Sequence, residues 1–520
     1  MVVDDEGTGT ELGGSGDRAA SGVWRSIWRT HFYAGIFAGP ILVWLALTGL
    51  VILYTGPLNS LLHADLYRVP VKSSTVSLAT QVESAKAAMP SGQLESVTPP
   101  SRPGWTTTVA FTAFDGTERE VFVDPYTGRV TGEAMAGGGL VGFANRTHGS
   151  ILPRSITVPM PTLAGILGEG PTIQHIELGE VLVEIAAGWG LVLALSGLYL
   201  WWPRDRAGRR RWLPRFSTPG RARLRSLHVA SGLVLGGFLF FSVVSGLPWA
   251  AFWGTNWSAV AAKVTPNTAN FYADAAPSSR VPHLGDLDRN GVKIPWAASM
   301  DAIPASRPAA PGTHPGHVHG AGMLSSSATT SPVNPVSIDT IEAAALAEGM
   351  MPGATYSPPA DETSKGKTTW GSWVVVNPWP SSLGQQGALY LDQFSAKTLG
   401  RSTAGQWGQL QRVTELGVQT HMGTEFGIWT RIFMTGGCLL VLWSFVTALL
   451  MWNRRRRGGT GFPRRPMEVR LAKPVGIAAI ILAIIYPLWG ASFVLVLLID
   501  HFVVQRSARL RRVFGMRSPA

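Results

Sequence analysis

Four apolar runs, each of twenty or more residues with few charges, set the first limit on what this chain can fold into. They extend from Ala34 to Tyr54, Leu178 to Trp202, Val229 to Trp253 and Ile428 to Trp452. At 1.5 Å per residue, about 20 helical residues cross a hydrocarbon layer of roughly 30 Å. Only 15% of the 520 residues are charged, which is well below the roughly 25% of soluble domains. We therefore predict a polytopic α-helical membrane bundle with four main spans.

A fifth apolar run, Val475 to Val504, permits two folds. Pro487 and Gly490 lie at its middle, and proline breaks the hydrogen bonding of a helix. The run is either one long tilted span or a hairpin of two short helices. Because the residues that follow it are basic and contain no acid, the hairpin agrees better with the charge rule applied below.

Basic residues are concentrated beside the predicted spans. Residues 1–30, 203–227, 453–473 and 502–520 carry 25 Lys or Arg against 7 Asp or Glu, whereas the long loops 57–175 and 254–427 carry 18 against 21. This is the positive-inside pattern. It predicts a cytoplasmic N-terminus and two long extracytoplasmic loops. The net charge of +12 is thus explained by membrane anchoring, and we expect no nucleic-acid partner.

Two kinds of redox machinery do not fit the sequence. Cys438 is the one cysteine, so neither an intramolecular disulfide nor a cysteine-ligated zinc or iron–sulfur site can form. The predicted cytoplasmic segments are about 30 residues or shorter, too short for a nucleotide-binding domain. Gly7-Thr-Gly9 precedes no helix and fails the dinucleotide fingerprint. Electrons for any redox reaction would have to come from a quinol or a separate cytoplasmic donor.

The chain contains an internal repeat. His31, Gly35, Gly39 and Gly49 recur at His228, Gly232, Gly236 and Gly246, always 197 residues later. VFVDPYTGRVTG (121–132) is matched by LYLDQFSAKTLG (389–400), each read as a strand followed by an Asp-initiated turn. We predict a tandem duplication, with one small extracytoplasmic α+β module in each long loop.

The repeat and the charge pattern together divide the chain into eleven segments. In chain order we expect a disordered cytoplasmic tail (1–24), a first span (25–56), a first outer module (57–147), an outer His segment with the second span (148–202), a basic cytoplasmic loop (203–227), a third span (228–253), an outer loop with a linker and the second module (254–420), an outer His segment with the fourth span (421–452), a basic cytoplasmic loop (453–473), the C-terminal membrane hairpin or helix (474–504) and a basic cytoplasmic tail (505–520).

The repeat places four histidines at two depths. His31 and His228 fall at the inner level, and His148 and His421 at the outer level. Two pairs of neutral imidazoles are what two bis-His b-type haems require, and nearby glycines leave room for a flat macrocycle. The same glycines also suit close helix packing. Proton-coupled transport and a purely structural bundle therefore remain open as alternatives.

Other ionisable residues are weaker candidates. Glu177, Glu180 and Glu184 lie on one helix face at the outer end of the second span; Glu184 and Glu180 form a possible proton or cation relay, whereas Glu177 is expected at the headgroups. His175 is the rival of His148 as outer ligand. His314, His317 and His319 have metal-like spacing but lie in a Pro-, Ala-, Ser- and Gly-rich linker, so weak metal capture is the less favoured interpretation.

Taken together, five segments of the chain resemble those of PepSY-associated transmembrane proteins. They are HFYAGIFAGPILVWLALTGLVILY, VFVDPYTGRVTGE, SGLYLWWPR, LHVASGLVLGGFLFFSVVSGLPW and THMGTEFGIWTRI. The resemblance implies PepSY modules in the outer loops, two b-type haems in the bundle and, by analogy with characterised members, reduction of ferric siderophores. Gln393 stands where the first module has Pro125, which leaves the second module's role in doubt.

On this resemblance we expect a membrane oxidoreductase of the bacterial plasma or inner membrane, with two haems b held by His31, His228, His148 and His421. It would pass electrons outward to a ferric chelate, as a ferric-siderophore reductase used for iron uptake. No side chain is expected to act as a catalytic acid, base or nucleophile. The alternative is a non-enzymatic protein whose anchored PepSY modules bind or regulate an extracytoplasmic partner. A second rival is a transporter that uses the glutamate face.

Overall fold

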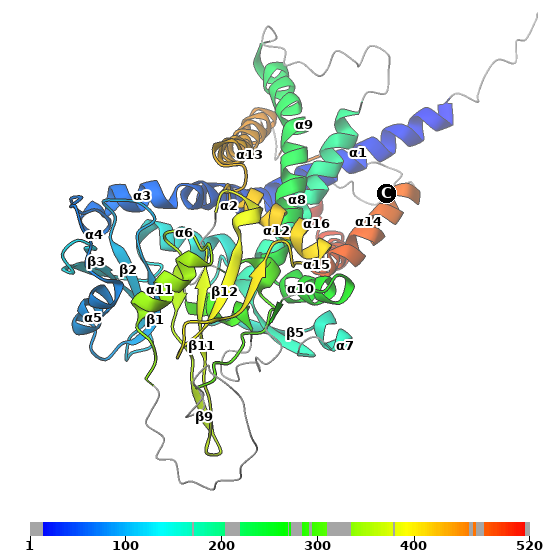
Figure 1. Cartoon of the computed structure of the whole chain (residues 1–520). Helices are drawn as coiled ribbons and strands as arrows, with labels where there is room; N and C mark the ends of the chain where they lie inside the picture. Colours follow the sequence, from blue (N-terminus) through cyan, green and yellow to red (C-terminus); the bar gives the residue numbers. More distant parts are fainter. Residues whose placement is uncertain are drawn as a thin grey trace, which may run out of the picture.

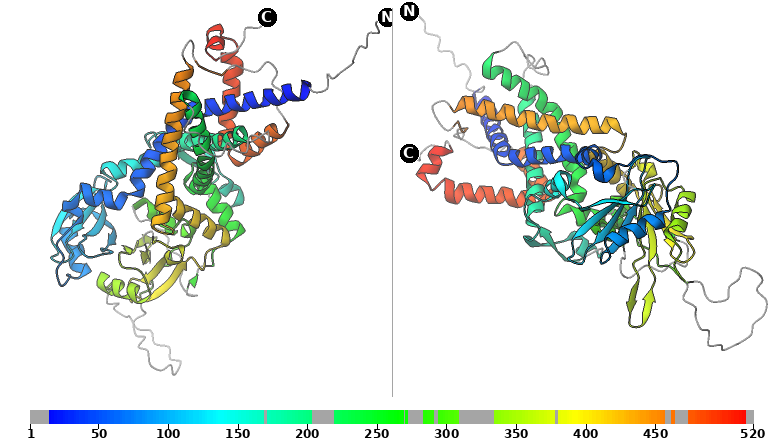
Figure 2. Two further views of the ribbon diagram at one scale, coloured as in Figure 1. Left: turned by 90° about the horizontal axis from the view of Figure 1, so that it is seen from above. Right: turned by 90° about the vertical axis from the view of Figure 1, so that its left-hand side faces the viewer.

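The computed structural model divides into a helical part and a part built on a β-sheet (Figure 1). It describes residues 14–168, 171–202, 219–268, 270–271, 283–290, 294–308, 334–377, 380–456, 461–463 and 473–514. The further views show the long helices gathered to one side of the sheet (Figure 2). Within the described residues, four helices are long and apolar enough to cross a membrane, or five if a bent pair counts as one span.

The first predicted span is bent. Helices α1 (Gly14–Phe37) and α2 (Gly39–Leu53) meet at 51°. Pro40 lies in the first turn of α2 and has no N–H to donate to the preceding turn, which is a common cause of a kink. The predicted span from Ala34 to Tyr54 is therefore formed by two helices that meet at a bend, and together they are long and apolar enough to cross a membrane.

The second and fourth predicted spans are the long helices α8 (Leu178–Trp201) and α13 (Ile428–Arg455). The third differs from expectation. Helix α9 runs from Gly220 to Gly246 and tightens into a 3₁₀ turn at Leu247–Trp249, where Pro248 interrupts it. Trp253, expected to end this span, instead begins a separate helix, α10 (Trp253–Val264).

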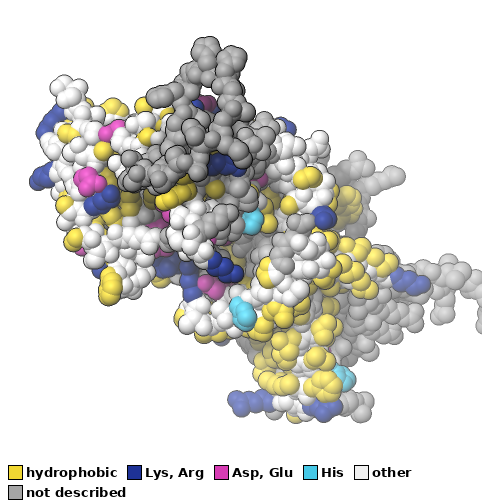
Figure 3. All heavy atoms as spheres, turned by 60° about the horizontal axis from the view of Figure 1, so that its bottom comes forward, with side chains coloured by type: hydrophobic (Ala, Val, Ile, Leu, Met, Phe, Trp, Pro, Cys, Tyr) yellow, Lys and Arg dark blue, Asp and Glu magenta, His cyan; other side chains and the backbone are white. Residues whose placement is uncertain are grey.

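Apolar side chains fill the centre of the bundle. Phe238 of α9 fits against Gly437 of α13 so closely that any added Cβ there would lie 2.0 Å from its ring. Cys438 is buried beside them as a free thiol. Exposed apolar side chains continue along the outer faces of α13 and of the C-terminal helix α15 (Pro487–Ile499), and hydrophobic side chains gather over the helical part in the space-filling view (Figure 3). Such a surface fits a hydrocarbon environment.

The C-terminal apolar run is broken in two. Helix α14 (Lys473–Ile485) ends before Tyr486, and α15 (Pro487–Ile499) begins at the predicted proline and continues through a π-helical turn, Asp500–Val504. One long continuous helix is thereby excluded. Gly490 of α15 approaches Ala483 of α14, where an added Cβ would come within 2.8 Å. A short helix, α16 (Ala508–Val513), follows.

Each of the two long loops contributes one α+β module, and the strands of the two modules form a single antiparallel sheet. Each contributes a helix and then four strands. These are α5 (Leu78–Ala88), β1 (Gln93–Thr98), β2 (Thr107–Thr112), β3 (Glu118–Val123) and β4 (Val130–Met135), and then α11 (Ile338–Ala347), β8 (Thr355–Ser357), β11 (Ser372–Val376), β12 (Gly387–Asp392) and β13 (Thr398–Thr403). The strand order is β4-β3-β2-β1-β8-β11-β12-β13-β7, with β7 at Asn270–Phe271.

The first strands of the two modules join the halves of this sheet. Val97 of β1 pairs with Tyr356 of β8, and the hydroxyls of Thr98 and Thr355 are 2.9 Å apart. Beneath the joint, Asp339 at the start of α11 accepts a hydrogen bond of 2.9 Å from the backbone N–H of Ala79 at the start of α5. Both helices share one apolar core with the inner face of the sheet. The modules therefore depend on each other for burial.

The two predicted Asp-initiated turns both follow a strand. Asp124 accepts hydrogen bonds from the backbone N–H of Tyr126 and the hydroxyl of Thr127. Asp392 does the same for Phe394 and Ser395 in the second module. These are Asx turns, in which the side chain replaces a backbone acceptor.

Gln393 has a structural reason to replace the proline of the first turn. Its side-chain amide donates to the Asp361 carboxylate at 2.8 Å and to the Gly371 carbonyl at 2.9 Å. It thus ties the turn to the loop beyond β10 (Lys367–Thr369).

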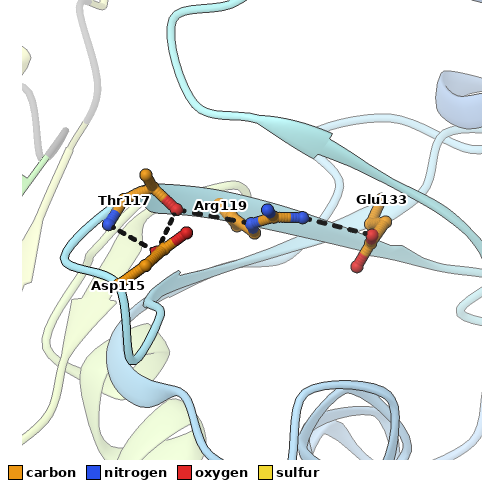
Figure 4. Close-up of polar contacts among 4 residues, drawn as sticks. All are labelled: Asp115, Thr117, Arg119 and Glu133. Atoms are coloured by element: carbon orange, nitrogen blue, oxygen red, sulfur yellow. Dashed lines mark hydrogen bonds and ion pairs between the residues drawn. The ribbon is translucent and has the colours of Figure 1, made fainter.

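The edge of the sheet in the first module carries exposed polar contacts. Arg119 of β3 lies 3.4 Å from the carboxylate of Glu133 on β4, and Asp115 binds Thr117 in the preceding turn (Figure 4). An exposed ion pair of this kind contributes at most about 1 kcal/mol. Charged side chains on an edge strand also discourage unwanted strand pairing.

Three further segments connect the sheet to the bundle. Helix α6 (Gly139–Gly149) follows β4 and packs against α2, and helix α12 (Gln409–His421) follows β13 and packs against α9. A hairpin of β5 (Thr157–Pro161) and β6 (Ile173–Glu177), with α7 (Leu163–Leu167) between its strands, leads into α8. Two of the four candidate histidines lie at the ends of α6 and α12.

Candidate functional site

The two inner histidines come together between the first and third membrane helices. His31 lies on α1 and His228 on α9, and their ring centres are 6.5 Å apart with the ring planes at 79°. The residues are 197 positions apart in the chain. Helices α1 and α9 both pack against α8, which sets the distance between the two backbones. We call these residues the inner pair.

The two outer histidines form a second pair with almost the same geometry. His148 is near the C-terminal end of α6 and His421 is the last residue of α12. Their ring centres are also 6.5 Å apart, with the planes at 72°. Neither helix is a membrane span, so the loops themselves return these side chains to the bundle. We call them the outer pair.

A hydroxyl group from a neighbouring helix contacts Nδ1 of every one of these rings. The distances are 2.9 Å from Ser196 to His31, 2.9 Å from Thr48 to His148, 3.0 Å from Ser245 to His421 and 3.2 Å from Thr447 to His228. Each hydroxyl also donates to a carbonyl one turn earlier in its own helix. The hydroxyl oxygen therefore accepts from Nδ1–H. This arrangement fixes the tautomer and leaves Nε2 with a lone pair for a metal ion.

A small residue follows each of these hydroxyls. Added Cβ atoms at Gly197, Gly49 and Gly246 would lie 3.3 Å, 3.3 Å and 3.5 Å from Cε1 of His31, His148 and His421. The fourth position is Ala448. The rings of His31, His148 and His421 thus each lie against a glycine of the neighbouring helix, which leaves room for the ring. Gly49 and Gly246 are both part of the 197-residue repeat. They lie against the rings of the outer pair, His148 and His421, and not beside the inner pair.

Sequence reasoning missed the hydroxyl partners. A signal was present, since Thr48-Gly49 and Ser245-Gly246 have the same 197-residue offset as His31 and His228. Ser and Thr are common in membrane helices as helix-to-helix contacts, however, and nothing in the sequence pairs them with a distant histidine.

The ring spacing fits a metal ion held between the two rings of each pair. Bonds of about 2 Å from iron to one nitrogen of each ring, with about 1 Å from nitrogen to ring centre, would place the two imidazole centres roughly 6 Å apart. The observed 6.5 Å agrees with this for both pairs. Along α9, Ser245 follows His228 by 17 residues, which separates the two levels by roughly 25 Å. The four residues thus fit two bis-imidazole centres stacked across the bundle.

Space beside the rings is uneven. Gly232, one turn from His228, has no atom within 4 Å of an added Cβ, and Gly236 has only a carbonyl oxygen at 3.9 Å. These positions leave open room next to the inner pair. Gly39, by contrast, lies against Phe445, which an added Cβ would approach to 2.7 Å. Gly39 therefore allows close packing of α2 against α13, which is the alternative role that the sequence analysis gave to these glycines.

The outer rings are electrically neutral. Burial lowers the pKa of His148 to about 4. Burial, with a smaller contribution from the neighbouring His148, also lowers the pKa of His421 to about 4. At neutral pH both rings are therefore unprotonated at one nitrogen, which is the form that binds metals.

The remaining candidates lie elsewhere. His175 is exposed on the β5–β6 hairpin, and the ring that reaches His421 is that of His148. Glu177 forms an ion pair of 3.6 Å with Arg154, Glu180 lines an open cleft and Glu184 is 2% exposed. His314, His317 and His319 lie outside the described residues. Among the described residues, no cluster of three or more His, Cys, Asp or Glu could hold a metal ion.

The helical bundle, its apolar outer surface and the attached sheet define a multi-pass membrane protein with an α+β part. The family described as the PepSY-associated TM region matches residues 28–455. The chain belongs to this family, which confirms the resemblance found in the sequence. No curated protein matches the chain.

Proposed function

We propose that this protein is a di-haem oxidoreductase that carries electrons across a membrane to an extracytoplasmic acceptor. The single observation that carries the proposal is the presence of two imidazole pairs of matching geometry, each with ring centres 6.5 Å apart. His31 and His228 would hold an inner haem b, and His148 and His421 an outer one. Each haem would supply an iron centre that accepts and releases one electron.

The chain's own residues would position and insulate these centres. The four hydroxyls hold Nδ1, so that Nε2 of each imidazole is directed to the ligand position. Helices α8, α9 and α13 exclude water between the two levels with apolar side chains. The family implies a ferric siderophore or another ferric chelate as acceptor, with a quinol or a cytoplasmic protein as donor.

The arginines support the proposed orientation. Arg455 of α13 lies over the ring of Trp28 on α1 at 4.6 Å, and Arg29 lies over Tyr33 at 5.2 Å. The side chain of Arg454 approaches Gly220 at the start of α9. Basic residues of α1 and α13 therefore lie near the start of α9, at the end that carries the inner pair. By the positive-inside rule this end would face the cytoplasm of a bacterial cell, with the sheet outside.

A vesicle experiment tests the proposed activity. The purified protein is reconstituted into liposomes that contain a membrane-impermeant reductant, and a ferric chelate with a ferrous indicator is added outside. We expect ferrous iron to appear outside only when the protein is present, and the rate to fall to the background level in His31→Ala. Equal rates for both proteins would reject the proposed electron path.

The alternative is an anchored PepSY protein that binds an outer partner and performs no redox chemistry. Its support is the joined nine-stranded sheet, to which both long loops contribute strands. It predicts a colourless protein after purification. It gives no reason for four buried imidazoles with four matched hydroxyl partners, which is why we favour the redox function.

A further inference from the structure

Glu184 is an acidic side chain enclosed in the helical part. It lies on α8 and is 2% exposed. Its Oε2 accepts a hydrogen bond of 2.7 Å from the backbone N–H of Phe252. Its Oε1 is buried and has no hydrogen-bond partner within the described part of the chain. An anionic oxygen left unsatisfied away from water is costly, so this oxygen is suited to carry a proton.

Two further polar groups are enclosed at the same interface. Tyr486 and Trp489, from the break and first turn of α15, are 2% and 3% exposed. Neither the Tyr486 hydroxyl nor the Trp489 Nε1 has a hydrogen-bond partner among the described residues. Trp489 lies against Gly188, one turn inward from Glu184, where an added Cβ would be 2.7 Å away. The Tyr486 hydroxyl interacts electrostatically with the Glu184 carboxylate.

An open cleft reaches the outer side of Glu184. It has a volume of about 460 Å³, and its lining includes His175, Glu180 and the segment Pro248–Ala251. Glu180 precedes Glu184 by one helical turn on the same face of α8. Phe252, whose N–H binds Glu184, directly follows the lining segment. The carboxyl group therefore lies just behind the wall of a cleft that is open to solvent.

The same cleft adjoins the outer pair. Trp249 lines it, and the Trp249 ring packs edge-on against His421 with 6.2 Å between ring centres. The segment from Trp249 to Phe252 thus contacts the outer pair at one end and Glu184 at the other. A change of charge at the outer pair would act on Glu184 across a short, water-poor path.

We propose that Glu184 is a proton-binding site, which takes one proton from the cleft for each electron that reaches the outer pair. This step rests on the proposed function, whose donor supplies the electron. One hydronium ion in the cleft gives a proton to Oε1 and becomes water, one O–H bond forms on the carboxyl group, and no bond of the chain breaks. The added positive charge offsets the negative charge of the electron.

A proton fits this site better than a metal cation. The other enclosed polar groups at this interface are the Tyr486 hydroxyl and the Trp489 N–H, and an indole N–H only donates. The other titratable groups on the surrounding elements are Glu180 on α8, His175 and Glu177 on β6, and Arg154, which forms an ion pair with Glu177. The 248–253 segment and α15 bring none. A cation would need several oxygen ligands at once, whereas one free oxygen suffices for a proton.

Infrared difference spectroscopy of the full-length protein in vesicles tests the carboxyl group itself. We expect a protonated-carboxyl band that titrates with pH, disappears in Glu184→Gln and shifts in frequency in Tyr486→Phe. Glu177→Gln, at the residue directly before α8, is the matched control, and it should leave the band unchanged. The glutamine amide oxygen can still accept from Phe252, so Glu184→Gln should fold, and its melting temperature checks this. A band that persists in Glu184→Gln would overturn the proposal.

Redox titration of the haem-loaded protein tests the link to electron transfer. The reduction potential of the outer centre should fall as pH rises, by about 59 mV per pH unit, because one proton per electron changes the equilibrium constant tenfold. In Glu184→Gln this slope should be lost, and Glu177→Gln should retain it. An unchanged slope in Glu184→Gln, or a slope replaced by dependence on Na⁺ concentration, would overturn the proposal. A protein that binds no haem would refute the proposed function. The infrared titration would still test whether Glu184 binds a proton, because it does not depend on haem.

Discussion

The Ser245 hydroxyl lies 3.0 Å from Nδ1 of His421, and the Thr48 hydroxyl lies 2.9 Å from Nδ1 of His148. Ser245 and Thr48 occupy equivalent positions in the 197-residue repeat, one position before Gly246 and Gly49. Each outer imidazole is therefore oriented by a helix that carries no outer ligand itself. The bundle sets the ring orientation, and the sheet-bearing loops supply the rings.

Removal of one hydroxyl should weaken the outer centre without removing its ligand. Ser245→Ala takes away the acceptor that fixes Nδ1–H of His421. Loss of such a hydrogen bond costs about 10- to 100-fold in metal affinity, so we expect weaker haem retention at the outer level. Haem content after dialysis against apomyoglobin measures the effect. Ser245→Thr keeps a hydroxyl and should retain the haem; equal loss in both variants would contradict the role of the hydrogen bond.

A side chain at Gly197 should displace His31. An alanine Cβ there would lie 3.3 Å from Cε1 of the ring, and valine adds two methyl groups in the same direction. We expect Gly197→Val to lose the inner haem and Gly197→Ala to perturb its spectrum. Gly476→Ala on α14 is the control, because an added Cβ at that position has no atom within 4 Å. An unaltered inner haem in Gly197→Val would show that the ring is not confined there.

The joint between the modules should contribute to stability. Asp339→Ala removes the carboxylate that binds the backbone N–H of Ala79 across the two modules. A hydrogen bond to a charged group contributes about 1.5–3 kcal/mol. We expect a lower melting temperature of the outer part, measured by the accessibility of its buried tryptophans on heating. Glu133→Gln, which breaks only an exposed ion pair, should have little effect. Equal melting of Asp339→Ala and the parent protein would mean that the modules are stabilised independently.

The sequence predicted the long helices, and it singled out the four histidines that the structure brings together in pairs, because both depend on local pattern. Apolar length marks α8 and α13, and the HxxxG spacing marks His31 and His228. Contacts between residues far apart in the chain have no comparable local sequence pattern. The single strand contact between Val97 and Tyr356 joins the modules, and no local signal distinguishes it from two separate sheets.

The helix bends and the hydroxyl partners of the histidines could not be predicted from the sequence either. Pro40 and Pro248 were visible, yet whether a proline bends a membrane helix or ends it depends on the neighbouring helices. Likewise Ser196 and Thr447 resemble any other small polar residue of a membrane span. They become recognisable only when a histidine from another helix is seen beside them. That the repeat arose by duplication stays a prediction.

Haem stoichiometry tests the central claim most directly. Reduced-minus-oxidised absorbance of the purified protein, with pyridine haemochrome quantification, should give two haems b per chain. His31→Ala and His228→Ala should each lose the same one of two spectral components, and His148→Ala and His421→Ala the other. A colourless parent protein, or an unchanged haem content in these four variants, would contradict the claim that the two imidazole pairs hold iron.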